Sequence, residues 1–564
     1  MNKTILLQDI EQKLKNIYKE KYKPKFFDMM KSTIEKFEGK AFDKVDVISE
    51  KNVYLITYGD SIYEEGIPTI HTLKKFLNNK VGDTITDVHI LPMFEYTSDD
   101  GFSIVDYMKI DKKLGNWESI NNLSKDYRLM YDFVANHVSK NSKWFQGYLN
   151  GEEKYQNYFI SEDKNFDYSN VIRPRTSPII HEYQGKDGVK TAWTIFSEDQ
   201  IDINVKHFPV LIEITEILLN YALNGASSIR LDAIGFLWKE SGTTCIHLPQ
   251  THMIIQLWRI ILDYFKKDTQ IITETNVPHL ENVSYFGDTT NEAHMVYQFT
   301  LPPLTLHTFT THDSTKLTKW ASTIGKVSNN ATFFNFLSSH DGIGMRPTEG
   351  ILTEEENKRL VDKTIINGGR VSYKDNPDGT KSVYELNINY LDALLNKDED
   401  IDEDVQIQKI LSAHALLLSF IGVPAIYYHS LLGSKNYYKG VEKSGINRRI
   451  NREKLEYNRI CYELEHDSRR NKIFTQLKNM IDIRKGESAF SPYANQNVLD
   501  FGKEIFALER ENKETNEKVV FITNVTPNEK IIDCGFNGIN ILENINIEGK
   551  LTLGAYKFVW IKIK

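Results

Sequence analysis

The stretch SSIRLDAIGF places two opposite charges, Arg230 and Asp232, in the middle of an otherwise apolar run. In a β-strand, residues two apart lie on the same face, so these side chains should be neighbours. Charged side chains are seldom buried unless they are paired or used in chemistry. One interpretation is a structural ion pair that closes a β core, and the other is a functional pair.

Polar and charged side chains also follow several other apolar runs. In chain order these residues are Asp60, Asp132, Asn136, His137, Arg230, Asp232, Glu274, His340 and Asp341. A single carboxylate in such a place could cap the following helix. Several that converge are costly for stability, because like charges repel and lose their hydration. The joint pattern therefore predicts a catalytic cluster, in which carboxylates can transfer protons or attack carbon.

The elements that would position this cluster are short β-rich runs that alternate with helical patterns. The eight runs are 53–60, 86–94, 127–136, 227–236, 270–276, 295–304, 332–341 and 423–432. Between them, segment 251–267 places Ile254, Leu257, Ile261 and Tyr264 along one helical stripe. Eight strand–helix repeats predict an α/β fold, a parallel (β/α)8 or TIM barrel with its active site at the carboxyl ends of the strands. A doubly wound open sheet is the alternative, but no glycine-rich phosphate fingerprint follows the first run.

The segments outside these repeats predict further domains. We expect an N-terminal helical segment (1–50), a barrel (51–138 and 207–486), an inserted B domain after strand three (139–206), an insertion after strand seven within the barrel (346–404) and a C-terminal antiparallel β domain (487–564). Loops as long as the two insertions are usually lids or small subdomains.

Composition limits the partners and the compartment. The net charge of -8 argues against nucleic acid or an anionic membrane as the main partner, so an anionic ligand would need a local cluster of Arg or Lys. The three cysteines are far apart, which suits a reducing compartment. No signal-peptide core or membrane-length apolar run occurs, so we expect a cytoplasmic protein, as a monomer or a homodimer.

Four stretches, DFVANH, IRLDA, ITETN and FLSSHD, resemble in this order the signature stretches of the α-amylase family of glycoside-active enzymes (glycoside hydrolase family 13). The resemblance extends from about residue 53 to the C-terminus. It implies that Asp232 is the nucleophile, Glu274 the general acid/base and Asp341 the transition-state stabiliser. It further implies that the sugar is contacted, and the carboxylates are held, by Arg230, His137 and His340.

The implied retaining mechanism needs one ionised carboxylate and one protonated carboxyl. Arg230 should favour the charged form of Asp232, and Glu274 should have a raised pKa through burial and neighbouring negative charge. Asp341 should face the sugar ring where positive charge develops.

Six further stretches, LITYGDS, VHILPMF, IRPR, WKESGTTC, SHDGIG and NRRINR, resemble the sucrose-phosphorylase group. That group transfers glucose from a disaccharide onto phosphate with retention, so inorganic phosphate is a co-substrate and no cofactor is implied. The resemblance implies that Asp60 and Arg448 bind glucosyl hydroxyls and that Phe102 is an apolar platform, although Phe102 could simply be a packing residue. Arg173 and Arg175, on the B domain, could hold phosphate or could be solvated loop charges.

The chain departs from sucrose phosphorylases beside the acceptor subsite. Asn276 follows the acid/base where those enzymes carry a His, and Phe236 replaces a Tyr. MRPTEGIL, GGRVSYK and IYYHSLLGSKNYYKG are instead similar to glucosylglycerate phosphorylases. Glycerate is a carboxylate and would need a cation; the candidates, each of which could equally be a surface residue, are Arg346, Arg370 and Lys374.

The resemblance therefore implies a hexosyltransferase-type phosphorylase acting on 2-O-α-D-glucosylglycerate. Phosphorolysis of sucrose or sucrose 6′-phosphate, another α-glucosidase or transglucosidase activity, and an inactive amylase-like binding scaffold remain as alternatives. Asn136 occupies a position that some amylases use for calcium. The sucrose-phosphorylase group generally does without calcium, so we predict no metal.

Overall fold

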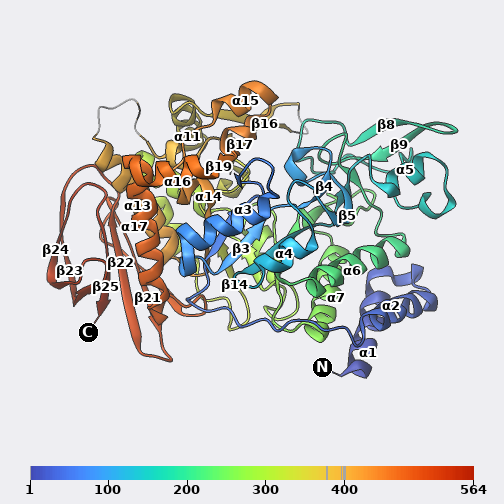
Figure 1. Cartoon of the computed structure of the whole chain (residues 1–564), viewed down its shortest axis with the longest axis horizontal. Helices are drawn as coiled ribbons and strands as arrows, with labels where there is room; N and C mark the ends of the chain where they lie inside the picture. Colours follow the sequence, from blue (N-terminus) through green and yellow to red (C-terminus); the bar gives the residue numbers. More distant parts are fainter. Residues whose placement is uncertain (1, 377–378, 396, 398–401, 564) are drawn as a thin grey trace.

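The computed structural model describes residues 2–376, 379–395, 397 and 402–563. Eight parallel strands form a closed barrel at its centre (Figure 1). They are β1 (Tyr54–Thr57), β3 (Asp87–Ile90), β6 (Arg128–Val134), β11 (Ala226–Asp232), β12 (Gln270–Thr273), β13 (Met295–Tyr297), β14 (Thr332–Asn335) and β18 (Val423–Tyr427). Because β1 pairs with both β3 and β18, the sheet has no free edge. The predicted barrel is confirmed, and each expected run contains one strand.

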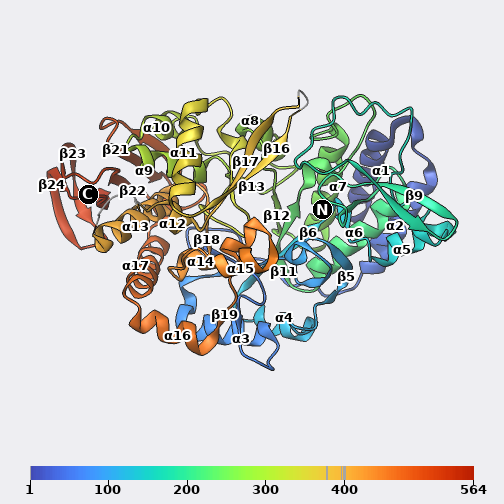
Figure 2. The ribbon, with the colours of Figure 1, turned by 90° about the horizontal axis from the view of Figure 1, so that it is seen from above.

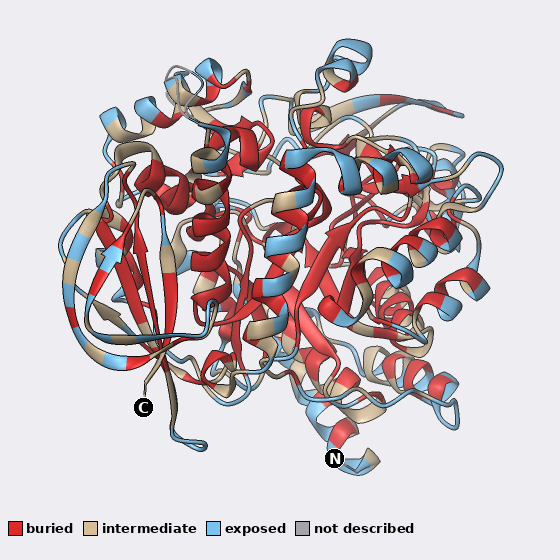
Figure 3. Cartoon of the chain, turned by 60° about the vertical axis from the view of Figure 1, so that its left-hand side comes forward, coloured by how far each residue is buried: buried red, intermediate tan, exposed pale blue. Residues whose placement is uncertain are grey.

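Helices surround this barrel. They are α3 (Thr69–Phe76), α4 (Trp117–Leu123), α6 (Phe208–Leu223), α7 (Pro249–Phe265), α8 (His279–Val283), α9 (Leu301–Thr311), α10 (Thr315–Ala321), α12 (Tyr390–Ala393), α13 (Glu403–Ser419), α14 (Tyr428–Leu431), α15 (Tyr438–Ser444), α16 (Tyr457–His466) and α17 (Ser468–Lys485). The stripe predicted for α7 holds, since Ile254, Leu257 and Ile261 are fully buried while Tyr264 is half-buried. Figure 3 shows the same division, with buried strands inside and exposed outer helix faces. Within the described part of the chain, no helix is long and apolar enough to span a bilayer.

Two helices precede the barrel, α1 (Lys3–Tyr18) and α2 (Pro24–Phe37). They lie beside α6 and α7 at one end of the molecule (Figure 1). The hydroxyl of Tyr18 donates to the carbonyl of Val205 at 2.7 Å, and the Phe26 ring stacks on Phe208 with 4.3 Å between centroids. The N-terminal helices thus pack on the chain that leads from the first insertion back into the barrel.

The first insertion follows β6. Its elements are β7 (His137–Val138), α5 (Lys143–Leu149), β8 (Ile180–Gly185), β9 (Gly188–Trp193) and β10 (Ile201–Asp202). β10 pairs with β7 directly after the barrel strand, which closes the insertion against the barrel mouth. Nearby, β4 (Phe94–Tyr96) and β5 (Ile104–Ile110) form a hairpin after β3, and β2 (Ile62–Tyr63) pairs with β19 (Leu455–Glu456).

The second insertion follows β14. It contains β15 (Ile343–Gly344), α11 (Glu354–Ile366), β16 (Arg370–Asp375) and β17 (Lys381–Asn387), with the strands in the order β15-β17-β16. Figure 2 shows the β16–β17 hairpin beside α11. Because β15 starts two residues after Asp341, this small sheet is joined directly to the end of a barrel strand.

A six-stranded antiparallel sheet ends the chain, at the left of Figure 1. Its strands are β20 (Asn495–Leu499), β21 (Ile505–Asn512), β22 (Glu517–Asn524), β23 (Lys530–Asn540), β24 (Ile545–Leu553) and β25 (Phe558–Ile563). Trp560 on β25 is fully buried and donates its indole N–H to Ser419 at the end of α13, at 2.7 Å. The predicted C-terminal β sheet is confirmed, whereas the exact domain boundaries stay a prediction.

Candidate active site

Arg230 lies at the centre of the carboxylate cluster. It is on β11, where it pairs in register with Asp132 on β6, and only 2% of it is exposed. One guanidinium nitrogen, Nη1, donates to Asp232 Oδ1 at 2.7 Å and also bonds Asp132. The other, Nη2, lies 3.8 Å from Glu274 Oε2. The alternating charges in SSIRLDAIGF therefore belong to one buried network that joins three neighbouring strands.

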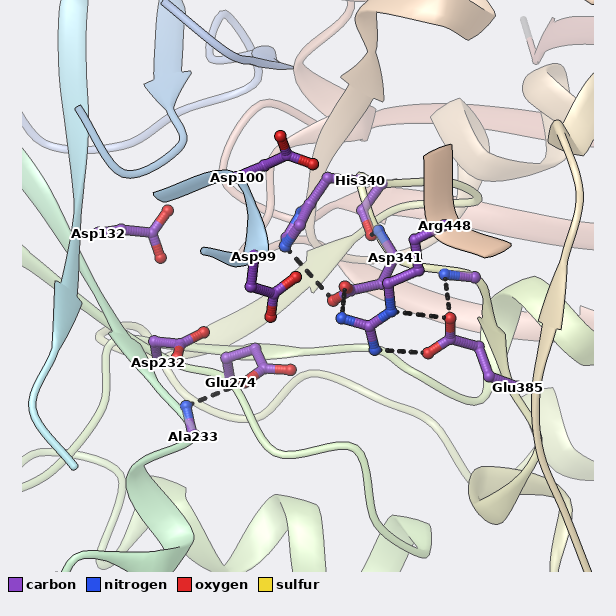
Figure 4. Close-up of polar contacts among 12 residues, drawn as sticks. Asp99, Asp100, Asp132, Asp232, Ala233, Glu274, His340, Asp341, Glu385 and Arg448 are labelled. Carbon is purple, nitrogen blue, oxygen red and sulfur yellow. Dashed lines mark hydrogen bonds and ion pairs between the residues drawn. The ribbon is translucent and has the colours of Figure 1, made fainter. Parts of the chain in front are cut away.

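The three carboxylates predicted to be catalytic line one cavity. Asp232, Glu274 and Asp341 come from the carboxyl ends of β11, β12 and β14 (Figure 4). Glu274 is held by the backbone N–H of Ala233, which donates to its Oε2 at 3.1 Å. Ala233 has a left-handed backbone (φ 49°), which alanine rarely adopts.

Burial and charge set the protonation of these acids. Burial raises the pKa of Asp232 well above its usual value, with Arg230 acting against it and the charge of Glu274 adding to it. Burial also raises the pKa of Glu274; Arg230 opposes this and Asp341 adds to it. The raised pKa of Glu274 agrees with expectation, whereas Arg230 does not by itself keep Asp232 ionised. Asp232 and Glu274 therefore hold a proton between them at a pH where isolated carboxylates have lost theirs.

Asp341 differs from the other two acids. Burial disfavours its charge, but Arg448 and Arg452 hold the pKa of Asp341 below its usual value. Nη1 of Arg448 lies 2.5 Å from Asp341 Oδ1, and Nη2 of Arg452 lies 3.6 Å from the same oxygen. One wall of the cavity thus carries a fixed negative charge.

The predicted sugar contacts Phe102, His137 and His340 line the same cavity. The rings of Phe102 and His340 stack with 4.7 Å between centroids and an angle of 6° between planes. Nε2 of His137 lies 3.0 Å from the Phe102 carbonyl. Burial lowers the pKa of both histidines, so each is a neutral imidazole at neutral pH. Phe102 therefore serves packing and cavity lining together.

Arg448 is fixed by a residue that sequence reasoning missed, Glu385 on β17. The two side chains form a bidentate pair, with Nε to Oε1 at 3.0 Å and Nη2 to Oε2 at 2.6 Å (Figure 4). Glu385 is 1% exposed and also accepts from the backbone N–H of Gly342, at 2.9 Å. Because Glu385 lies on an inserted hairpin, the search along barrel strand ends could not find it.

Asp60 is not among the residues that line the cavity. Its Oδ1 pairs with Lys454 Nζ at 2.5 Å, in a separate groove lined also by Tyr63 and Lys112. The acidic residue of this part of the chain that does line the cavity is Asp99. The sequence could have indicated Asp99 as a site residue, because it lies three residues before Phe102 in the same stretch, SDDGF.

The two arginines of the IRPR stretch are placed differently. Arg175 lines the cavity, and its guanidinium lies 5.4 Å from the ring centroid of Tyr384 on β17. Nη2 of Arg173 instead donates to the carbonyl of Ser177 in its own loop, at 2.6 Å. The structure thus brings one of the two to the carboxylates.

The other expected acceptor residues lie outside the cavity lining. Nε of Arg346 and Nζ of Lys374 lie 3.7 Å and 4.0 Å from the same oxygen of Glu349. Arg370 is exposed and donates to the carbonyl of Gly369 at 3.1 Å. Asn276 packs against Gly344, where a Cβ would lie only 2.5 Å from its Oδ1. Arg346 and Lys374 therefore form a cluster of their own.

The position considered for calcium holds a lysine side chain. Nζ of Lys239 lies 2.7 Å from Asn136 Oδ1 and 2.6 Å from Asp202 Oδ2, and all three residues are buried. The ammonium group of Lys239 thus neutralises the carboxylate of Asp202 and donates to the amide oxygen of Asn136. Among described residues, no group of three or more His, Cys, Asp or Glu side chains is arranged to hold a metal ion. The absence of a metal stays a prediction.

Comparisons with known proteins agree with this geometry. Residues 80–361 match the family described as alpha amylase, catalytic domain. The chain is similar to glucosylglycerate phosphorylases of Allomeiothermus silvanus (45% identity, 91% of each chain) and Escherichia coli (41% identity, 91% of this chain and 92% of that one). A sucrose phosphorylase of Streptococcus mutans is 28% identical over 82% of this chain and 92% of its own.

A solved structure supports the fold. The sucrose 6F-phosphate phosphorylase from Thermoanaerobacter thermosaccharolyticum superimposes with a TM-score of 0.72 at 24% identity, over 84% of this chain and 94% of that one. Together with the barrel and its three carboxylates, these likenesses show that the chain belongs to the α-amylase family.

Proposed function

We propose that this protein is a retaining glucoside phosphorylase that converts 2-O-α-D-glucosylglycerate and phosphate into α-glucose 1-phosphate and glycerate. One observation carries the proposal: a nucleophile, an acid and a fixed anion line one small cavity together with an arginine that is free to bind phosphate. The similarity to glucosylglycerate phosphorylases supports the choice of donor.

In the first half-reaction Asp232 attacks the anomeric carbon while Glu274 donates a proton to the glycosidic oxygen. The roles follow from the contacts with Arg230, whose nitrogens lie 2.7 Å from Asp232 and 3.8 Å from Glu274. The shorter, hydrogen-bonded contact favours the negative charge on Asp232 and leaves the shared proton on Glu274. The glycosidic bond breaks, glycerate leaves with the proton, and a covalent glucosyl-enzyme remains.

In the second half-reaction phosphate takes the place of the departed glycerate. Glu274, now ionised, accepts a proton from the attacking phosphate oxygen, which forms a bond to the anomeric carbon as the bond to Asp232 breaks. Two inversions leave the α configuration unchanged. Arg175 binds the phosphate, since a guanidinium matches the geometry of two phosphate oxygens.

Asp341 acts in both half-reactions. Positive charge develops on the sugar ring in each transition state, and a carboxylate beside the ring stabilises that charge. Arg448 and Arg452 keep Asp341 ionised for this task. Stacked Phe102 and His340 supply the apolar floor under the glucosyl unit.

The decisive experiment compares donors with and without phosphate. We expect α-glucose 1-phosphate to form from glucosylglycerate when phosphate is present, and much less from sucrose, sucrose 6′-phosphate or glucosylglycerol. The matched control is Asp232→Asn, which should lower turnover about 10⁴-fold or more, because nothing else can carry the glucosyl group. Release of free glucose at a phosphate-independent rate would instead identify a hydrolase.

A further inference from the structure

Arg175 is a positively charged residue that lies among the carboxylates of the cavity. The cavity is lined by four carboxylates, from Asp99, Asp232, Glu274 and Asp341, and by two arginines, Arg175 and Arg448. Arg448 is held by Glu385 and Asp341. In the described part of the chain Arg175 has no hydrogen bond or ion pair; its guanidinium lies 5.4 Å from the ring centroid of Tyr384, and its charge helps to hold the pKa of Asp341 below the usual value. A guanidinium in such a place can offer its N–H donors to an anionic ligand.

The proposed reaction, on which this inference rests, brings two anions to that place in turn. Asp232 attacks the sugar from one face, so glycerate must leave, and phosphate must enter, from the opposite face beside Glu274. The two therefore occupy one subsite at different times. In glucosylglycerate the carboxylate is attached to the carbon that bears the glycosidic oxygen, and in phosphate the charged oxygens share the phosphorus with the attacking oxygen. Each anion thus lies next to the reacting oxygen.

We propose that Arg175 is a shared anion-binding residue, which binds the carboxylate of glycerate in one half-reaction and phosphate in the other. A planar guanidinium accepts either group through two parallel hydrogen bonds. The ring of Tyr384 attracts the guanidinium without using its N–H donors. The same residue then selects acceptors that carry negative charge over neutral ones such as glycerol.

The alternative cations are less well placed. Arg346 and Lys374 already approach the carboxylate of Glu349 and are not among the cavity-lining residues. Nη2 of Arg173 is bonded to a carbonyl of its own loop. A carboxylate so close to the glycosidic oxygen needs a cation within the cavity itself.

The test forms the glucosyl-enzyme from α-glucosyl fluoride, whose leaving group needs no arginine. Phosphate, glycerate and glycerol are then offered at equal concentrations, and the three products are quantified. The variants are Arg175→Gln and Arg175→Lys, with Arg346→Gln and Lys374→Met for the competing cluster. Arg359→Gln is the matched control, because Arg359 is an exposed arginine on α11 that pairs with Glu355.

Wild type should make glucosyl phosphate and glucosylglycerate in preference to glucosylglycerol. Arg175→Gln should reduce both preferences together by about ten- to a hundredfold, the usual effect of losing charge-assisted hydrogen bonds, while transfer to glycerol persists. Arg175→Lys should recover part of the preference for phosphate and part of the preference for glycerate. Arg359→Gln should behave as wild type.

The inference is overturned if Arg175→Gln loses transfer to phosphate but keeps its preference for glycerate over glycerol. It is also overturned if that preference falls in Arg346→Gln or Lys374→Met and not in Arg175→Gln. A wild-type enzyme that transfers glucose to water but never to phosphate would contradict the proposed function instead, and the two failures can therefore be told apart.

Discussion

At the scale of single residues, the site depends on unequal contacts to one guanidinium. Arg230 bonds Asp132 and Asp232 directly and approaches Glu274 less closely. Burial raises the pKa of both Asp232 and Glu274, so the pair retains a proton that isolated carboxylates would release. In the proposed mechanism the active form carries one proton on the pair.

This arrangement predicts a bell-shaped dependence of kcat/KM on pH. Activity should fall at low pH, as a second proton neutralises the nucleophile, and at high pH, as Glu274 loses its proton. Because burial and the charge of Asp341 raise the pKa of Glu274, the basic limb should lie above the ordinary range of glutamic acid. The profile is measured by phosphorolysis of glucosylglycerate, whose glycerate leaving group needs the proton that Glu274 donates.

The control for this profile is Glu274→Gln. With an activated aryl α-glucoside, whose departure needs little proton assistance, the first half-reaction of this variant should proceed without the basic limb, because the titrating acid is gone. A basic limb that is unchanged in Glu274→Gln would show that another group titrates there.

At the scale of elements, the β16–β17 hairpin contributes Glu385 to a site whose three acids follow barrel strands. Glu385 holds Arg448 by two hydrogen bonds and holds the backbone next to Asp341 by a third. Arg448 in turn fixes Asp341. Glu385 is thus a positioning residue that acts through Arg448.

Replacing Glu385 by Gln should leave the fold intact but free Arg448 to turn fully toward Asp341. We expect kcat/KM to fall about ten- to a hundredfold, the usual loss when a buried charged pair is broken at an active site. The loss should appear mainly as a higher KM for the glucosyl donor, with Glu385→Asp recovering part of it. The matched control is Glu355→Gln, an exposed carboxylate on α11 of the same insertion. Equal activity of Glu385→Gln and Glu355→Gln would refute the positioning role.

Comparing the predicted site residues with their places in the structure shows which features the sequence could predict. The barrel strands could be predicted because their periodicity is strong and their charged ends have no other good explanation, as for Arg230 and Asp232. Glu385 could not, because a strand added by an insertion places its side chains by tertiary contacts rather than by period. Asp99 was overlooked although it lies in the same stretch as Phe102, because it is in the turn of the β4–β5 hairpin and not at a barrel strand end. Asp60 was assigned from its strand end and from the resemblance of LITYGDS, and its partner Lys454 lies far away in sequence.

At the scale of the whole molecule, Lys239 joins three parts of the chain. Its ammonium group binds Asn136 after β6 and Asp202 on β10, while Lys239 itself follows β11. The barrel and the first insertion are thereby linked by a buried ion pair. Removing one partner of such a pair is far costlier than removing both.

Lys239→Met should therefore lower the free energy of unfolding by about 3 kcal/mol or more, measured by urea denaturation. The double variant Lys239→Met with Asp202→Asn should recover part of this loss. Lys206→Met, which breaks a more exposed pair with Glu240, should cost about 1 kcal/mol or less.

Because the ammonium group supplies the positive charge, a chelator should leave activity unchanged. Activity that disappears with chelator would contradict this account.

Two consecutive residues of β17 contact the two arginines that line the cavity, Tyr384 on Arg175 and Glu385 on Arg448. Strand pairing moves such neighbours as a unit, so a slip of one residue in the β16–β17 register would displace both contacts together. With the proposed roles of Arg448 and Arg175, recognition of the donor sugar and choice of acceptor are for this reason not separately adjustable by changing the length of this hairpin. We expect that replacing this hairpin by one from another enzyme, if it widened the range of acceptors, would also weaken binding of the glucosyl unit. Binding would be kept only if the new hairpin placed a tyrosine and a glutamate at the register of Tyr384 and Glu385.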